Sequence, residues 1–155
     1  MSHLLSTFFY VGYLRPAPGT WGSLVALIIA YIIARYTGYL ALAFAILLVF
    51  AIGWITITLQ ASRTGRHDPT EIVIDEVVGQ WISVLPLAIW QISYGVPLFY
   101  WFLAFVIFRI LDIKKPSLIG WADRKNTPLS VMLDDVIAGL ATAVIIYLAI
   151  LIIKT

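Results

Sequence analysis

The sequence predicts an all-α protein: a polytopic membrane bundle of about five helices that forms one domain over residues 1–155. Hydrophobic residues make up 62% of the chain and charged residues 12%, whereas a soluble domain has roughly 45–50% and about 25%. The apolar residues form long runs separated by short polar loops, which is the pattern of helices that cross a bilayer. This length leaves no room for a separate soluble module.

Each long apolar run predicts one helix, and clusters of Pro, Gly and polar residues mark the turns between them. The first run is short, since a bilayer needs about 20 residues, and this leaves open a tilted helix, a partly re-entrant one, or one that starts deep in the interface. Pro86 is expected to kink the third helix. The five helices are expected at about 22–36, 39–60, 71–92, 98–113 and 131–153.

The positions of the basic residues predict the orientation of the bundle. If the amino terminus is cytoplasmic, every Lys and Arg except Arg35 and Lys154 falls on the cytoplasmic side, as the positive-inside rule requires. Every acidic residue falls on that side too. The opposite turn around Gly95 is uncharged and is flanked by aromatic residues such as Trp90 and Tyr100, which are typical of a membrane interface. The charged chemistry is therefore expected at the cytoplasmic face.

A near-repeat joins two of the expected helices. Ile-Asp-Glu-Val-Val-Gly ends at Gly79, and Leu-Asp-Asp-Val-Ile-Ala-Gly ends at Gly139. Asp75 precedes the first glycine by four residues and Asp135 precedes the second by four, so each carboxylate lies one turn from a glycine on the same helix face. Because glycine lets helices approach closely, the spacing predicts that the two acidic pairs meet.

The acidic residues beside these apolar runs indicate a cation site. An ionised carboxylate near hydrocarbon costs several kcal/mol unless a cation or a hydrogen-bond network compensates it. Carboxylate oxygens are hard ligands that suit magnesium or manganese. The alternative is that acids in a first helical turn act as caps, which explains one pair more easily than two. The candidate metal ligands are Asp75, Glu76, Asp112, Asp134 and Asp135.

Two segments are candidates for binding phosphate. Arg109, Asp112 and Lys115 recur every three residues and can form one face, although snorkelling at the interface with an incidental ion pair is an alternative. The segment 16–23 leads into the first helix, and its backbone N–H groups and hydroxyls make a possible anion nest. An ordinary Pro/Gly turn followed by a helix cap is the alternative for that segment.

Four motifs, in order along the chain, carry a resemblance to a known family. GYLRPAPGTWGSL, DPTEIVIDEVVGQW, FRILDIKKPSLI and VMLDDVIAGL together span residues 12–140, and they resemble the phosphatidylglycerophosphatase A family. The resemblance implies a magnesium-dependent lipid phosphatase of the bacterial inner membrane, with its active site facing the cytoplasm. Such an enzyme removes the terminal phosphate of phosphatidylglycerophosphate to give phosphatidylglycerol. In one departure, Ser117-Leu118 follows Lys115-Pro116 where many members have Trp-Pro.

The resemblance also implies roles for particular residues. The family's motif positions correspond here to Pro18, Gly19, Thr20, Gly22, Ser23, Asp68, Asp75, Glu76, Gly79, Arg109, Asp112, Lys115, Pro116, Asp134, Asp135 and Gly139. The expected catalytic residues are Asp75, Asp134 and Lys115, and the expected substrate-binding residues are Gly19, Thr20, Ser23, Arg109 and Lys115. Direct attack by water at bound Mg²⁺ is favoured, while a phosphoaspartyl intermediate on Asp75 or Asp134 stays open.

Other classes of function are less consistent with the sequence. The chain has no cysteine, which excludes disulfides, iron–sulfur clusters and Cys-ligated zinc, and its net charge of +2 does not indicate nucleic acid. A cation channel or transporter with an interfacial carboxylate ion site is the alternative function. Transporters tend to place ion sites near the bilayer midplane, whereas the acids here gather at one interface. The oligomeric state is left open by the sequence.

Overall fold

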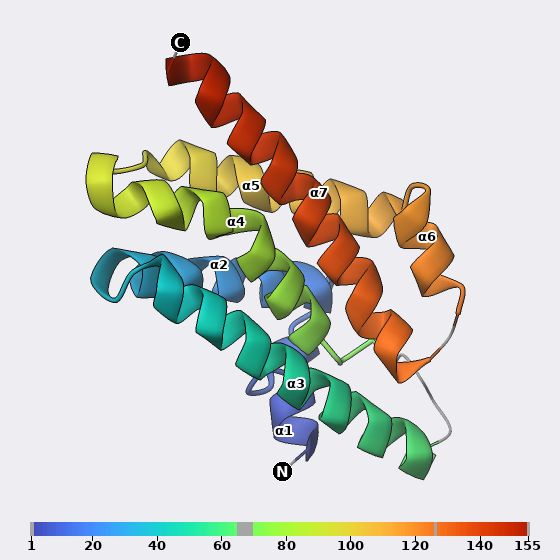
Figure 1. Ribbon diagram of the computed structural model, residues 1–155. Coiled ribbons are helices and arrows are strands. Elements are labelled where there is room, and N and C mark those ends of the chain that lie inside the picture. Colours follow the sequence, from blue (N-terminus) through green and yellow to red (C-terminus); the bar gives the residue numbers. More distant parts are fainter. Residues whose placement is uncertain (1, 65–69, 126, 155) are drawn as a thin grey trace.

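The computed structural model describes residues 2–64, 70–125 and 127–154, and within these residues it contains helices and no strands (Figure 1). The predicted all-α fold is confirmed, and the described residues form seven α-helices and one short 3-10 helix where about five helices were expected. The elements are α1 (Ser2–Ser6), η1 (Val11–Tyr13), α2 (Pro18–Tyr36), α3 (Tyr39–Thr64), α4 (Ile74–Tyr94), α5 (Leu98–Lys114), α6 (Leu118–Asp123) and α7 (Pro128–Lys154).

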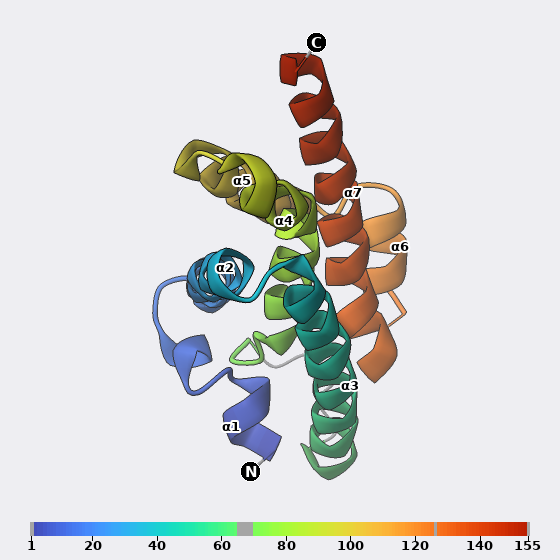
Figure 2. The same ribbon diagram turned by 60° about the vertical axis from the view of Figure 1, so that its left-hand side comes forward.

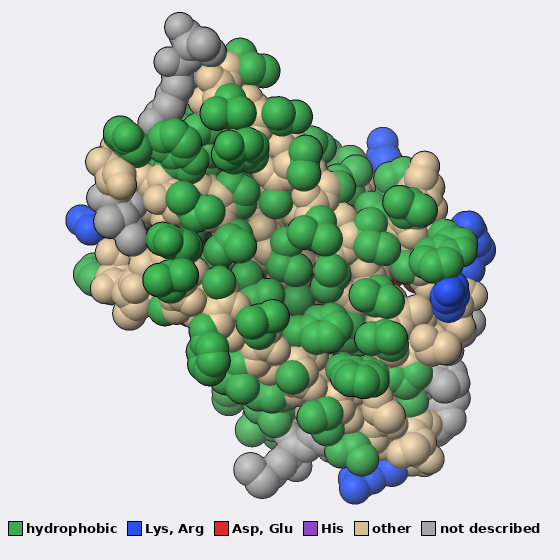
Figure 3. All heavy atoms as spheres, viewed as in Figure 1, with side chains coloured by type: hydrophobic (Ala, Val, Ile, Leu, Met, Phe, Trp, Pro, Cys, Tyr) green, Lys and Arg blue, Asp and Glu red, His purple; other side chains and the backbone are tan. Residues whose placement is uncertain are grey.

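Three of the described helices are long and apolar enough to cross a membrane: α2, α3 over Tyr39–Arg63, and α7 over Pro128–Ile152. The helix expected at 22–36 begins four residues earlier, because Pro18 occupies the first turn, where its fixed φ and missing N–H are tolerated. This gives α2 a length of 19 residues. Apolar side chains cover the face of the molecule in Figure 3, as expected of a surface that meets lipid.

Helix α4 lies at the centre of the bundle and contacts α2, α3, α5 and α7. Its side chains Val77, Val84 and Leu87 are fully buried, and the indole N–H of Trp81 donates to the Ala26 carbonyl of α2 at 2.8 Å. Pro86 lies inside α4, and Figure 1 shows the helix changing direction along its length. The apolar core is therefore built around the helix that also carries the first acidic pair.

Helices α4 and α7 touch at the two glycines of the near-repeat, as the sequence predicted. A Cβ atom at Gly139 would lie 2.4 Å from the Gly79 carbonyl oxygen, and one at Gly79 would lie 2.7 Å from the Asp135 carbonyl oxygen. These partners are backbone atoms, which cannot move aside as a flexible side chain can. Only glycine at both positions permits this contact.

Two short segments were not predicted. Helix α6 lies within the segment expected to be a polar loop, and it buries Ile119 and Ala122 while lying beside α7 (Figures 1 and 2). At the amino terminus, α1 and η1 pack against the start of α4: the Val73 N–H donates to the Ser6 carbonyl at 3.0 Å, and Gly12 lies against the carbonyl of Glu71. The amino-terminal segment thus fixes the backbone that leads into the first acidic pair.

The glycine contact generates a prediction about stability. Alanine is more favourable than glycine in a helix by about 1 kcal/mol, but a methyl group forced against a backbone carbonyl costs about 1–3 kcal/mol. We therefore expect Gly139→Ala to lower the melting temperature in detergent, although propensity alone predicts the opposite. Ala51→Val, which adds bulk at an exposed position of α3, is the control. An unchanged or higher melting temperature for Gly139→Ala would contradict the close contact.

Candidate active site

The first acidic pair lies in the first turn of α4. Val73 is the residue before the helix, and no side chain caps it. The Asp75 carboxylate instead accepts the backbone N–H of Glu76 at 3.1 Å. Asp75 is 7% exposed, and the Glu76 side chain is 16% exposed. Both carboxylates are therefore turned into the protein rather than outward as surface caps.

The second acidic pair lies deeper in its helix than the sequence indicated. Because α7 begins at Pro128, its first turn holds no acidic residue. The start of the helix is capped by Thr127 and Ser130, whose hydroxyls each accept the other's backbone N–H, at 3.1 and 2.8 Å. Asp134 and Asp135 are thus not needed as caps. The Asp134 carboxylate accepts the N–H of Asp135 at 3.1 Å, which repeats the arrangement of the first pair.

Three carboxylates from the two pairs converge. Asp75, Glu76 and Asp135 each offer an oxygen atom, and these atoms all lie within 4.8 Å of one another. Within the described part of the chain, Glu76 Oε2 and Asp135 Oδ1 are buried and have no hydrogen-bond partner. Asp112 and Asp134 are further carboxylate neighbours of Asp135. Buried carboxylates this close together repel one another, and a bound cation would stabilise them. Hard oxygen ligands suit Mg²⁺.

A cavity of about 220 Å³ opens at this cluster. It brings together all five candidate metal ligands and Lys115, with Asp123 and Thr70 added. Its lining residues are Thr70, Ile72, Asp75, Glu76, Asp112, Lys115, Asp123, Val131, Asp134 and Asp135. The near-repeat and the charged face at the end of α5 therefore form one site, contributed by α4, α5, α6 and α7.

Arg109 links the cluster to the start of α2. Its Nη1 atom donates to Asp112 Oδ2 at 2.5 Å and to Ser23 Oγ at 3.3 Å, and it lies 4.0 Å from Glu76 Oε1. Ser23 in turn donates to the Gly19 carbonyl at 2.8 Å. A Cβ atom at Gly19 would lie 2.0 Å from Glu76 Oε1, so the backbone of α2 directly meets the acidic cluster.

The first turn of α2 offers backbone donors at the same place. Gly19 and Thr20 lie in that turn, where N–H groups have no acceptor within the helix. Helix amino termini favour anions for this reason. The segment expected as an anion nest at the helix start therefore lies in the first turns of α2, and the buried hydroxyl of Ser23 already bonds to Gly19 and Arg109.

Lys115 is a second cation in contact with the carboxylates of the site. It follows α5 in a left-handed conformation, with φ 45° and ψ 54°, which is unusual for a residue other than glycine. Its Nζ donates to Asp134 Oδ2 at 2.8 Å and to Asp123 Oδ1. Burial lowers the pKa of the Lys115 ammonium, but the hydrogen bonds and charges of Asp123 and Asp134 outweigh burial and raise this pKa above its ordinary value. Lys115 therefore stays cationic at neutral pH.

Some site residues were not predicted, and one prediction lies outside the described residues. Asp68, a motif position of the resemblance, falls in the segment 65–69, which the structure does not describe. Asp123 and Thr70 line the cavity but were not expected there. The short, largely apolar run from Leu118 to Ala122 could have indicated the helix α6. Asp123 ends this helix and pairs with Lys115.

The cluster predicts opposite effects of one substitution with and without metal. Asp135→Asn removes a buried charge without changing the side-chain size, so without metal it should stabilise the protein by about 1 kcal/mol or more. The same change would remove a ligand of the candidate metal site, so the increase in melting temperature expected on adding Mg²⁺ to the wild type should be largely lost. Thermal unfolding in detergent, in EDTA and then in Mg²⁺, measures both effects.

The control for this measurement is Glu71→Gln, since Glu71 does not line the cavity. It should leave the effect of Mg²⁺ on the melting temperature as in the wild type. A full Mg²⁺-induced increase in the Asp135→Asn variant would show that Asp135 does not bind the metal.

Comparisons with known proteins agree with the four motifs. The family model for phosphatidylglycerophosphatase A matches residues 4–150. The chain is 34% identical over 149 residues to phosphatidylglycerophosphatase A of Haemophilus influenzae, with 94% of this chain and 86% of the relative covered. It is 37% identical over 149 residues to phosphatidylglycerophosphatase A of Escherichia coli, with 94% and 81% covered.

A third relative has a different name. A protein of Bacteroides thetaiotaomicron, named as a putative phosphatidylinositol-3-phosphatase, is 33% identical over 154 residues, with 94% of this chain and 91% of the relative covered. No solved structure gives a significant match. Since the family model and these relatives match nearly the whole length, the chain belongs to the phosphatidylglycerophosphatase A family of phosphoric monoester hydrolases.

Proposed function

We propose that the chain hydrolyses the terminal phosphomonoester of phosphatidylglycerophosphate, releasing phosphate and phosphatidylglycerol, and that it requires Mg²⁺. The observation that carries the proposal is the cavity lined by the carboxylates of Asp75, Glu76 and Asp135 and by Lys115, with the guanidinium of Arg109 4.0 Å from Glu76. Phosphoryl transfer needs both kinds of group, because charge on the phosphoryl oxygens must be neutralised while a nucleophile is oriented. Two relatives named for this activity support the choice of substrate.

The acidic cluster fits Mg²⁺. Asp75, Glu76 and Asp135 would hold the ion, and the orphaned Glu76 Oε2 and Asp135 Oδ1 atoms would gain the partner that they lack. Bound there, Mg²⁺ would supply charge neutralisation at the phosphoryl oxygens and would lower the pKa of a water molecule. Asp112 and Asp134 stand beside the cluster, each already paired with a cation, and complete the proposed ligand set.

The chain's own cations would hold the phosphate. Lys115 and Arg109 direct N–H donors to carboxylates of the site, and the first-turn N–H groups of Gly19 and Thr20 add uncharged donors. Donors fixed before the reaction stabilise the charge that develops in the transition state. Asp134 keeps the Lys115 ammonium in place through their 2.8 Å hydrogen bond.

Two routes for the attack remain within the proposal. Asp75 lines the cavity, so its carboxylate is placed to orient an attacking water molecule, which is the favoured route. In the alternative, Asp75 or Asp134 attacks phosphorus, phosphatidylglycerol leaves as the ester bond breaks, and water then hydrolyses the phosphoaspartyl intermediate to release phosphate. The hydrogen bond from Lys115 draws electron density from Asp134 and makes it the weaker nucleophile of the two.

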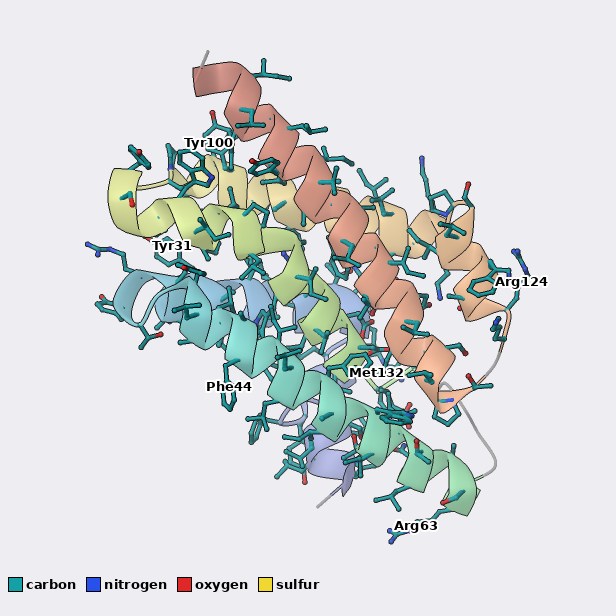
Figure 4. The ribbon with its side chains drawn as sticks, viewed as in Figure 1. Tyr31, Phe44, Arg63, Tyr100, Arg124 and Met132 are labelled. Carbon is teal, nitrogen blue, oxygen red and sulfur yellow. The ribbon has the colours of Figure 1, made fainter. Side chains whose placement is uncertain are left out.

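A lipid substrate agrees with the setting of the site. Three of the described helices are long and apolar enough to cross a membrane, and the phosphate of a lipid lies at the level of the headgroups. Figure 4 shows Arg63 and Arg124 toward one end of the bundle and Tyr31 and Tyr100 toward the other. This separation supports a bacterial inner-membrane protein whose basic end, and with it the active site, faces the cytoplasm. None of the relatives named above is described as a channel or transporter.

The choice of headgroup is the part of the proposal that most needs a test. Purified protein in detergent with Mg²⁺ should release phosphate from phosphatidylglycerophosphate at least about 10-fold faster, as kcat/KM, than from phosphatidylinositol 3-phosphate or phosphatidic acid, a difference of about 1.4 kcal/mol. The second lipid is included because of the name of the Bacteroides relative. Faster release from phosphatidylinositol 3-phosphate would replace the proposed substrate, and release from none of the lipids would refute the phosphatase activity.

Metal dependence is tested in the same assay. Excess EDTA should reduce turnover by about 100-fold or more, equivalent to at least about 2.7 kcal/mol, because the acidic cluster then repels the phosphate. Added Mg²⁺ should restore the rate, and EDTA already saturated with Mg²⁺ serves as the control. Full activity in excess EDTA would exclude a metal requirement.

A further inference from the structure

We propose that Asp123 is a positioning residue that holds the Lys115 ammonium at the open side of the cavity, where it meets the phosphate. The inference rests on the proposed function and adds a residue to it. Asp123 is not among the motif positions of the resemblance, and it does not belong to the three-carboxylate cluster. Its contact with Lys115 is what assigns the role.

Lys115 is shared between two carboxylates that differ in exposure. Its Nζ donates to Asp134 Oδ2 and to Asp123 Oδ1. The Asp134 side chain is 7% exposed and the Asp123 side chain is 41% exposed, with Lys115 between them at 30%. The two acceptors therefore stretch the side chain between the closed and the open side of the cavity. With Asp134 alone, the ammonium would be drawn toward the closed side.

Two backbone features bring Asp123 next to the side chain of Lys115: the end of α5 and the packing of Gly120 in α6. The left-handed conformation of Lys115 ends α5, and α6 then runs in a new direction beside α7 (Figure 1). Gly120 of α6 then packs against the Lys115 carbonyl, since a Cβ atom at Gly120 would lie 2.5 Å from that oxygen. Asp123 follows Gly120 by three residues and so lies on the same face of the helix. The close packing of α6 on the residue that follows α5 thus brings a carboxylate to the side chain of Lys115.

The bonding capacity of the ammonium agrees with this role. An ammonium group has three N–H donors, and the two carboxylates use two of them. The third is available for a phosphoryl oxygen, and its direction is set by the other two. Asp123 therefore improves phosphate binding although its own charge is negative.

Positioning and simple electrostatics predict opposite results for the same variant. Removing the negative charge of Asp123 should favour anion binding if charge alone matters. If Asp123 positions Lys115, the Asp123→Asn variant should bind phosphate less tightly. The loss of phosphate binding should also disappear when the Lys115 ammonium is removed by substitution, which a double-mutant cycle measures.

The experiment measures binding of inorganic phosphate to the Mg²⁺-loaded protein in detergent, together with KM and kcat for phosphatidylglycerophosphate. Asp123→Asn should weaken phosphate binding and raise KM by about 10-fold, with kcat within about 3-fold of the wild type. Asp123→Glu should restore part of the loss. In the Lys115→Gln background, Asp123→Asn should weaken binding no further.

Two variants serve as controls: Glu71→Gln removes an acidic charge away from the cavity lining, and Lys114→Gln removes the exposed cation next to Lys115. Both should bind phosphate as the wild type does. Unchanged or tighter phosphate binding by Asp123→Asn would overturn the proposal, as would an equal loss in the Lys115→Gln background. A wild-type protein that binds phosphate but releases none from the lipid would instead refute the proposed function, and the phosphate-binding cycle would still test Asp123.

Discussion

The close contact between α4 and α7 is the constraint on which the site depends. Gly79 and Gly139 bring the two backbones together, and the Asp135 carbonyl itself lies against Gly79. The acidic pairs lie one turn before these glycines on each helix, so backbone contact at the glycines forces the carboxylates together. A larger residue at either glycine would separate the helices and, with them, the oxygens that lie within 4.8 Å of one another.

This contact concentrates negative charge that the protein only partly compensates. Six carboxylates line the cavity, and two cations, Arg109 and Lys115, are in contact with them. Arg109 pairs most closely with Asp112, and Lys115 divides its donors between Asp123 and Asp134. The remaining three carboxylates include buried oxygens without a partner. Such an arrangement costs stability in the absence of a cation, which is what a site built to bind one would show.

The sequence predicted the parts of this arrangement that follow from helical periodicity. The four-residue spacing of acid and glycine in the near-repeat predicted the helix contact, and the three-residue spacing of Arg109 and Asp112 agrees with their ion pair. Lys115, expected on the same helical face, instead follows the end of α5. The sequence alone did not exclude the alternative that Asp134 and Asp135 cap their helix. The structure argues against it, because α7 starts at Pro128 and is capped by Thr127 and Ser130.

The parts that depend on irregular backbone could not be predicted. The positive φ angles of Lys115 and Ser117 have no signal in the sequence, since neither residue is a glycine or an asparagine. The turn that places Asp123 beside Lys115 was therefore missed, and the six residues of α6 were too few to show helical periodicity. The amino-terminal segment was missed for a related reason: it is held by backbone contacts to residues near Val73, which no side-chain pattern reports.

The most direct test of the central claim is the position of a bound metal. Mn²⁺ substitutes for Mg²⁺ at oxygen sites and can be located in crystals by its anomalous scattering. The account predicts an anomalous peak roughly 2.0–2.2 Å from carboxylate oxygens of Asp75, Glu76 and Asp135, one turn from the glycine contact. A peak held elsewhere in the cavity, away from these three residues, or no peak at millimolar Mn²⁺, would contradict it.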